Sequence, residues 1–170
     1  MALGLPGSEC ADIANAALLH DIGKIVVPLE IISKPTSLTN EEFQIVKTHC
    51  VIGETVLSGT GDPLLALAAE IALHHHEKFN GTGYPNGFRG EDIPLPGRIV
   101  GICDVYDALR RDRPYRPGSA HDETISIITI GDGRTSPGDF DYRILKVFLH
   151  NSARIENMYK NVGLKLGQLE

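Results

Sequence analysis

The 170-residue chain is long enough to bury a sizeable core, and 42% hydrophobic and 22% charged residues are ordinary for one globular domain spanning residues 1–170. Its net charge of -6 argues against DNA or RNA as partners, because nucleic-acid-binding domains usually carry a basic face. No apolar run approaches the ~20 residues that span a bilayer, and the start does not resemble a signal peptide. Three scattered cysteines fit a reduced compartment, so we expect a cytoplasmic protein.

Apolar residues recur mostly at helical spacing. Residues 9–20 predict a helix that leads directly into a His-Asp pair, and residues 24–32 predict a short extended stretch. Thr39 followed by Glu42 is a capping-box pattern, which predicts the start of a helix that runs to about Leu57.

The second half of the chain shows the same alternation of helices and breaks. Asp62-Pro63 predicts an N-cap and a first-turn proline for a helix running to about Glu77. The Gly- and Pro-rich segment 78–97 predicts a long ordered loop. Further helices are predicted over about 97–110, from Ser119, and from about Phe140 after a break at 131–138. Five to seven helices with almost no period-two alternation predict an all-α, compact helical bundle.

Four of the seven histidines lie in two short segments, His20-Asp21 and His74-His75-His76-Glu77, each with a carboxylate beside it. Imidazole and carboxylate together suit a divalent catalytic metal with open coordination positions, whereas imidazole with thiolate would indicate structural zinc. Either segment alone is also typical of a solvated helix end. Of the three consecutive histidines, we expect His74 to be structural.

Two further residues are candidates by their surroundings. His49 lies within the apolar arc of its helix, a position more typical of a core histidine than of a ligand. Asp104 lies in an otherwise apolar helix, where an unpaired carboxylate is costly, so a metal or Arg98 should relieve it. Asp107, three residues on, shares the helix face of Asp104 and could orient a ligand or water.

The segment Arg110–Arg116 is the one dense basic patch in this acidic chain. Arginine side chains suit bidentate phosphate contacts, but a solvated helix end explains the patch equally well. The pair Gly81-x-Gly83 is a weak phosphate-binding signal, because it follows a helix rather than a strand.

Taken in order, these motifs resemble the HD-GYP branch of the HD superfamily over about residues 15–150. The resemblance is carried by His20-Asp21-x-Gly23-Lys24, His49, His75-His76-Glu77-x-x-Asn80-Gly81-x-Gly83-Tyr84-Pro85, Arg98-Ile99, Asp104-x-x-Asp107-Ala108-Leu109, Arg113-Pro114-Tyr115 and Phe140-Asp141. It implies an all-helical HD domain that hydrolyses the bacterial second messenger cyclic di-GMP to pGpG and, in some members, to GMP.

The resemblance also implies two or three metal ions, often iron or manganese, although His/Asp sites accept nickel and zinc as well. Carried over position by position, the metal ligands are His20, Asp21, His49, His75, His76 and Asp104. Asp21 suits a bridging ligand, since one carboxylate can reach two cations. Lys24, Arg113 and Arg116 match substrate-contacting positions, and Asp21, Lys24 and Asp107 are the candidate catalytic residues. Gly81, Gly83, Tyr84 and Pro85 would line the site and form a docking loop for GGDEF-domain partners.

The chain departs from the family pattern in two places. Asn80 stands where the family usually has Asp, for which we expect a changed hydrogen-bond partner rather than lost metal. Only 19 residues precede His20, whereas the family has an earlier helix with another histidine ligand, so we expect two metals rather than three. Either the chain is a fragment of a longer regulator, with a sensory or receiver domain upstream, or the family's site is pared down here. Two alternatives stay open: a catalytically weak interaction module, and a broader HD phosphohydrolase acting on ordinary nucleotides.

Overall fold

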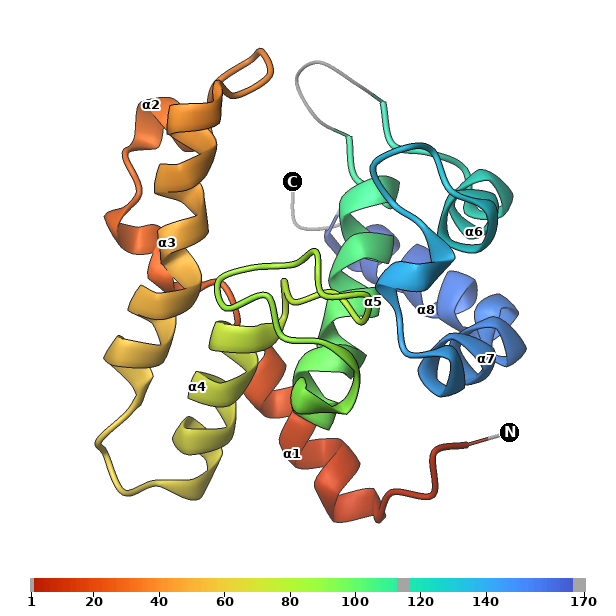
Figure 1. Ribbon diagram of the computed structural model, residues 1–170. Coiled ribbons are helices and arrows are strands. Elements are labelled where there is room, and N and C mark those ends of the chain that lie inside the picture. The colour runs from red at the N-terminus through yellow and green to blue at the C-terminus, as the bar shows by residue number, and fades with distance from the viewer. Residues whose placement is uncertain (1, 113–116, 167–170) are drawn as a thin grey trace.

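The computed structural model describes residues 2–112 and 117–166, and this part of the chain is helical without a β-strand (Figure 1). The all-α prediction is confirmed. The helices, in chain order, are α1 (Gly7–Ala17), η1 (Ile22–Val26), α2 (Leu29–Ile32), α3 (Asn40–Leu57), α4 (Pro63–His74), η2 (Gly90–Asp92), α5 (Leu95–Arg110), α6 (His121–Ile130), η3 (Pro137–Asp139), α7 (Tyr142–His150) and α8 (Ser152–Leu166), where η marks a short 3-10 helix.

Two helix starts form as predicted. At α3 the Glu42 backbone N–H donates to the Thr39 hydroxyl at 3.2 Å, and the Thr39 N–H donates to the Glu42 carboxylate at 2.7 Å. At α4 the carboxylate of Asp62 accepts from the N–H groups of Leu64 and Leu65. Both caps satisfy donors that have no partner within the helix, so local sequence fixes where these helices begin.

Three boundaries differ from the prediction. Residues 24–32 are not extended, because η1 and α2 occupy most of them; Pro28 lies just before α2, where a proline removes no helical hydrogen bond. Helix α1 ends at Ala17, so the His-Asp pair lies in a turn beyond it, and α4 ends at His74 rather than near Glu77. In the last two cases, the residues just beyond the helix end are candidate metal ligands.

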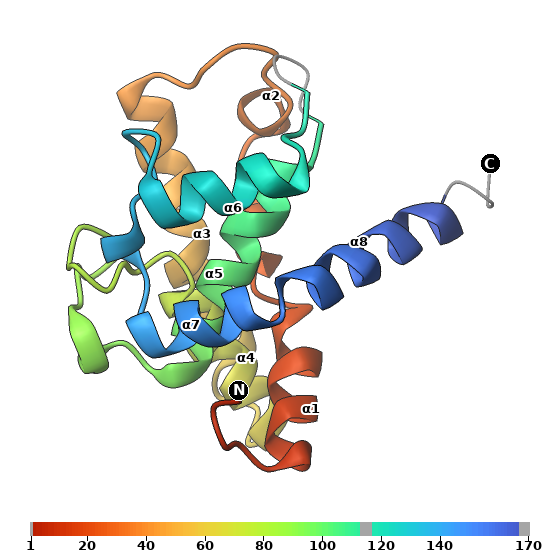
Figure 2. The same ribbon diagram turned by 90° about the vertical axis from the view of Figure 1, so that its right-hand side faces the viewer.

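Helix α5 lies between two hydrophobic clusters. One joins α1, α3, α4 and α5 through Ile13, Ala16, Leu57, Ala68, Ala69, Ile71, Ala72 and Val100. The other joins α5 to the C-terminal helices through Ile102, Tyr106, Leu109, Ile128, Phe140, Ile144 and Phe148. Figure 2 shows α8 extending away from this body. The N-terminal half of α5 packs on α4, which places the middle of α5 beside the end of α4.

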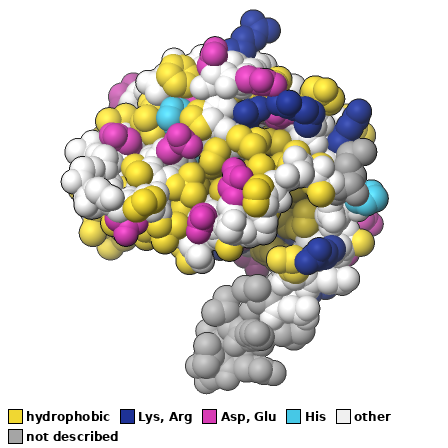
Figure 3. Space-filling model, turned by 90° about the horizontal axis from the view of Figure 1, so that it is seen from below, with side chains coloured by type: hydrophobic (Ala, Val, Ile, Leu, Met, Phe, Trp, Pro, Cys, Tyr) yellow, Lys and Arg dark blue, Asp and Glu magenta, His cyan; other side chains and the backbone are white. Residues whose placement is uncertain are grey.

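The surface below α1 carries many hydrophobic side chains with acidic ones scattered among them (Figure 3). An apolar groove of about 460 Å³ lies between residues 2–5, α1, α5 and α7. Among the residues that the structure describes, no helix is both long and apolar enough to cross a membrane.

Candidate metal centre

Four segments distant in sequence converge on one cluster of histidines and aspartates. They are the turn after α1, the middle of α3, the residues just after α4, and the middle of α5. The turn can approach α3 only because residue 23 is glycine, since a Cβ there would overlap the backbone carbonyl of His49. This close approach places Asp21 beside His49.

Asp21 lies at the centre of the cluster. Its Oδ1 is 3.4 Å from Nε2 of His49 and 3.7 Å from Nε2 of His75. Its Oδ2 is 3.3 Å from Nε2 of His20 and accepts a hydrogen bond from Nζ of Lys24 at 2.5 Å. The two oxygens of one carboxylate therefore face two different sets of side chains.

Asp104 completes the side of the cluster nearer α5. Its Oδ1 is 3.7 Å from Nε2 of His20, and its Oδ2 is 3.9 Å from Nδ1 of His76. One potential ligand atom from each of Asp21, His49, His75 and His76 lies within 4.8 Å of the others. All six residues predicted as ligands are thus brought together, including His49, which is fully buried.

Backbone carbonyls orient three of the imidazoles. Nδ1 of His20 lies 2.7 Å from the carbonyl of Ala17, and Nδ1 of His49 lies 2.6 Å from that of Val46. Nδ1 of His75 lies 2.9 Å from the carbonyl of Ala72. A carbonyl only accepts hydrogen bonds, so each Nδ1 carries a proton, and in the neutral form of each ring Nε2 presents a lone pair to the cluster. This is the arrangement that metal-binding histidines use.

The lone pairs in the cluster oppose one another. Nε2 of His49 and Nε2 of His75 are 3.4 Å apart, and neither has a proton for the other. The buried Oδ1 of Asp21 between them has no hydrogen-bond donor among the described residues. Buried acceptors normally find a donor or a cation, so the residues present fit a metal ion at this point.

The charges within the cluster keep its carboxylates ionised. Burial by itself would lower the pKa of His20, but the adjacent carboxylates of Asp104 and Asp21 raise it to about 10. Burial would raise the pKa of Asp21, yet the neighbouring side chains of His20, His75 and Lys24 hold it far below its ordinary value. The pKa of His76 is lowered, chiefly by burial and by the neighbouring His75, which favours the neutral ring that a metal needs.

The loop after the histidines is fixed to the site by backbone contacts. The buried Glu77 carboxylate accepts hydrogen bonds from the N–H groups of Asn86, Gly87 and Phe88 at 2.7–3.2 Å. Gly83 packs directly on the backbone of Glu77, where a Cβ would overlap. In the sequence Glu77 is the carboxylate beside the consecutive histidines, but in the fold its oxygens hold the loop through three backbone donors.

Tyr84 of this loop packs against the cluster. Its ring centre lies 4.8 Å from that of His76, and its backbone N–H donates to the carbonyl of His76 at 3.1 Å. Its ring also meets that of Phe43 on α3 edge to face, 5.9 Å between centres. His74 stays apart, stacked on Phe88 at 5.5 Å with Nδ1 near the carbonyl of Glu70, as a structural histidine would be.

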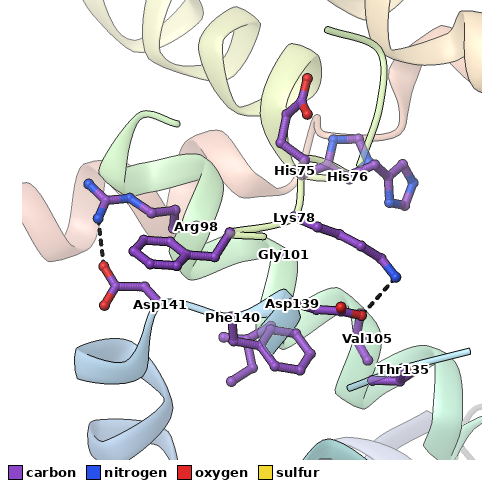
Figure 4. Close-up of a pocket in the computed structure, with 13 residues that line it drawn as sticks. His75, His76, Lys78, Arg98, Gly101, Val105, Thr135, Asp139, Phe140 and Asp141 are labelled. Carbon is purple, nitrogen blue, oxygen red and sulfur yellow. Dashed lines mark hydrogen bonds and ion pairs between the residues drawn. The ribbon is translucent and has the colours of Figure 1, made fainter. Parts of the chain in front are cut away.

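A small cavity of about 70 Å³ lies between the end of α4, α5 and residues 135–141 (Figure 4). Two ion pairs border it: Lys78 contacts Asp139 at 2.7 Å, and Arg98 contacts Asp141 at 2.6 Å. Asn80 donates from Nδ2 to Asp139 at 2.9 Å. The partner of Asn80 is therefore a residue outside the histidine cluster.

The roles expected for Arg98, Asp107 and the two arginines after α5 have different outcomes. Arg98 does not relieve Asp104, because its guanidinium pairs with Asp141 and Asp104 faces His20 and His76. One oxygen of Asp107 contacts Arg111 at 2.6 Å, so its proposed orienting role stays a prediction. Arg113 and Arg116 lie outside the described residues.

Fold and site together define an all-helical protein with a His/Asp cluster suited to metal. The chain belongs to the HD-domain family, whose model matches residues 1–135. A solved structure of an HDG"Y"P protein from Bdellovibrio bacteriovorus, Bd1817, shares the fold, with a TM-score of 0.64 at 22% identity over 85% of this chain and 44% of that one.

Curated relatives carry names of cyclic dinucleotide phosphodiesterases. The chain is 40% identical over 156 residues to the cyclic di-GMP phosphodiesterase response regulator RpfG of Xanthomonas campestris, covering 92% of this chain and 40% of that protein. It is 39% identical over 158 residues to a cyclic di-GMP phosphodiesterase of Thermotoga maritima, covering 93% and 42%. It is 45% identical over 113 residues to the 3'3'-cGAMP-specific phosphodiesterase 2 of Vibrio cholerae, covering 66% and 22%. The chain therefore spans less than half the length of these relatives.

Proposed function

We propose that this chain is a metal-dependent phosphodiesterase that hydrolyses cyclic di-GMP to pGpG and, by a second hydrolysis, to GMP. One observation carries the proposal: the two oxygens of Asp21 face separate imidazole groups, as a carboxylate that bridges two cations would. The names of the relatives support a cyclic dinucleotide as the substrate.

The proposed ligands are His20, Asp21, His49, His75, His76 and Asp104, holding two divalent ions, with iron or manganese favoured over nickel or zinc. Such ions would supply positive charge to the phosphate oxygens and acidify an attacking water molecule. The protein's part is to hold the ligands: backbone carbonyls fix three imidazoles, and neighbouring charges keep Asp21 ionised.

Lys24 has the geometry to assist. Its ammonium group has three N–H donors, of which Asp21 takes one, so the others can donate to a phosphate oxygen and stabilise charge as it develops. We assign Asp107 to orienting water or substrate through the oxygen that does not contact Arg111. Arg113 and Arg116 are proposed as further phosphate contacts.

The proposal extends to the domain organisation, the compartment and the partner proteins. The chain would act as one domain, in the cytoplasm, downstream of a sensory or receiver domain. The loop Gly81–Pro85 would serve GGDEF-domain partners. Within this loop Tyr84 and the two glycines, Gly81 and Gly83, are half-buried against the site. The neighbouring residues Asn86–Arg89 are exposed and offer the accessible part of a partner-binding surface.

The test compares Asp21→Asn with Asp12→Asn, an exposed aspartate on α1. Metal content is measured on protein purified without added metal or chelator, together with cyclic di-GMP turnover. We expect two metals and turnover in the parent and in Asp12→Asn. Asp21→Asn should lose metal and more than about 100-fold in activity, beyond what removing a supporting partner costs.

Other outcomes would select the alternatives. A parent protein with less than one metal, and without turnover after iron or manganese is supplied, would indicate an interaction module. Comparable hydrolysis of nucleoside mono- or triphosphates in a substrate panel would indicate a broader HD phosphohydrolase.

A further inference from the structure

A second hollow opens next to the metal centre. It is a groove of about 340 Å³ between α2, the N-terminal half of α3, and residues 111–112 just beyond α5, and its lining includes Lys24, Val27, Ile31, Lys34, Val46 and Arg111. In Figure 1 these elements face each other across the upper part of the molecule. The volume falls within the range of about 300–1,000 Å³ that is usual for small-molecule sites.

The groove is continuous with the cluster. Lys24 lines its inner end and also donates to Asp21. Val46 lines its wall one helical turn before His49, and its carbonyl orients that histidine. Lys24 and Val46 therefore border both the cluster and the groove, which places the groove beside any phosphate held at the cluster.

The lining combines an apolar wall with a cation at each end, and it also includes Asp112, whose carboxylate accepts a hydrogen bond from the backbone N–H of Gly118 at 2.7 Å. Val27 and Ile31 are buried and Val46 is half-buried, which gives the apolar surface that a nucleobase prefers. Lys24 stands at the inner end and Arg111, whose side chain is 70% exposed, at the outer end.

The cations of the groove are not equivalent. Nζ of Lys34 donates to both carboxylate oxygens of Glu42, at 2.7 and 2.6 Å. Lys34 therefore holds its loop in place rather than binding a ligand. Arg111 contacts Asp107 through Nε alone, and a guanidinium has five N–H donors. Arg111 therefore has capacity for a second anion.

We infer that this groove binds the nucleoside of the cyclic dinucleotide that is remote from the reacting phosphodiester. The base lies against Val46 and Ile31, and Arg111 contacts the second phosphate. This inference rests on the proposed function and adds to it a specificity site made from residues outside the metal cluster.

The test uses two substitutions with matched controls. Ile32→Trp fills the groove, and Leu29→Trp places the same side chain on the same helix at an exposed position outside it. Arg111→Ala removes the outer cation, and Arg154→Ala removes an exposed cation on α8. The substrates are cyclic di-GMP and bis(p-nitrophenyl) phosphate, a phosphodiester that has one phosphate and no nucleobase.

We expect Ile32→Trp and Arg111→Ala to raise KM for cyclic di-GMP about 10-fold, the loss of one charge-assisted or well-packed contact. Their activity on bis(p-nitrophenyl) phosphate should stay within twofold of the parent, as should both controls on both substrates. The contrast separates a substrate subsite from damage to the cluster.

A KM for cyclic di-GMP within twofold of the parent in Arg111→Ala would overturn the inference while leaving the phosphodiesterase proposal intact. Should Ile32→Trp impair both substrates, the result for the exposed Arg111→Ala variant decides alone. A metal-loaded parent that hydrolyses neither substrate would instead show that the proposed function has failed.

Discussion

His49 shows how a single side chain can have opposite meanings in sequence and in structure. Its place on the apolar arc of a helix is typical of a core histidine, and it is indeed fully buried. Its Nε2 nevertheless faces Nε2 of His75 and the carboxylate of Asp21. Burial here serves to hold a lone pair in a fixed position, which a core role alone would not require.

The hydrogen bond between Asn80 and Asp139 can be tested by a single substitution. The Asn80 amide donates to the buried Asp139, so Asn80→Asp would place two carboxylates at hydrogen-bond distance. We expect a loss of about 1–3 kcal/mol in the free energy of unfolding at pH 7, the cost of an unmet buried acceptor. Urea denaturation measures it, with Asn15→Asp as the control, the same change at an exposed position on α1.

The pH dependence of this loss distinguishes repulsion from a mere change of shape. Two adjacent carboxylates raise each other's pKa, so one of them binds a proton more readily in the folded state. The penalty should therefore shrink as the pH falls towards about 4, near the ordinary aspartate pKa. A penalty that stays constant from pH 7 to pH 4 would contradict the charge explanation.

At the scale of elements, the contact between the His-Asp turn and α3 sets the geometry of the centre. The turn packs so closely that a Cβ on Gly23 would overlap the carbonyl of His49 and the backbone nitrogen of Gly53. The two sides are backbone, which cannot rotate away as a side chain can. The turn and α3 must therefore separate if residue 23 gains a side chain.

We expect Gly23→Ala to move Asp21 away from His49, lowering metal content at least 10-fold and thermal stability by several degrees, as overpacking costs about 1–3 kcal/mol. Elemental analysis and thermal unfolding measure both effects. Gly7→Ala, at the start of α1 where nothing lies near the added Cβ, is the matched control and should leave both unchanged. Full metal content in Gly23→Ala would show that the contact is not needed for the site.

At the scale of the whole molecule, a buried ion pair ties the C-terminal helices to α5. Arg98 near the start of α5 contacts Asp141, which caps α7 through the N–H of Arg143. Burial alone would raise the pKa of Asp141, but hydrogen bonds from Arg143 and Arg98 hold it below its ordinary value. A lowered pKa contributes stability that is complete above about pH 4 and is lost as the pH falls through the folded-state pKa.

Asp141→Asn should consequently lower the free energy of unfolding at pH 7 by on the order of 3 kcal/mol, because Arg98 keeps a buried charge without its partner. The difference from the parent should narrow between about pH 5 and pH 3, since the parent then loses the same interaction. Urea denaturation with saturating chelator in both proteins measures this without a contribution from metal. Parallel curves over that pH range would refute the role of the ion pair.

Local signals in the sequence were sufficient for much of the fold. The capping box at Thr39, the Asp62 cap and the Gly- and Pro-rich segment 78–97 each act within a few residues, so their effects can be predicted without knowing the rest of the chain. The six residues predicted as ligands were carried over from the resemblance to a known family; the helix position of His49 alone is more typical of a core histidine. The prediction of an extended stretch over residues 24–32 was wrong, because these residues form two short helices that pack on α3.

By itself, the sequence determined the helical class and the capped starts of α3 and α4, since these depend on neighbouring residues. The resemblance to a known family supplied the set of clustered histidines and aspartates. Only the tertiary structure decided the partners. Arg98 pairs with Asp141 rather than Asp104, Asn80 meets Asp139, and Lys24 joins the cluster to a groove. Such pairings join residues up to 59 positions apart, and hydrogen bonds and ion pairs depend on distances of a few ångströms that only the packed chain fixes.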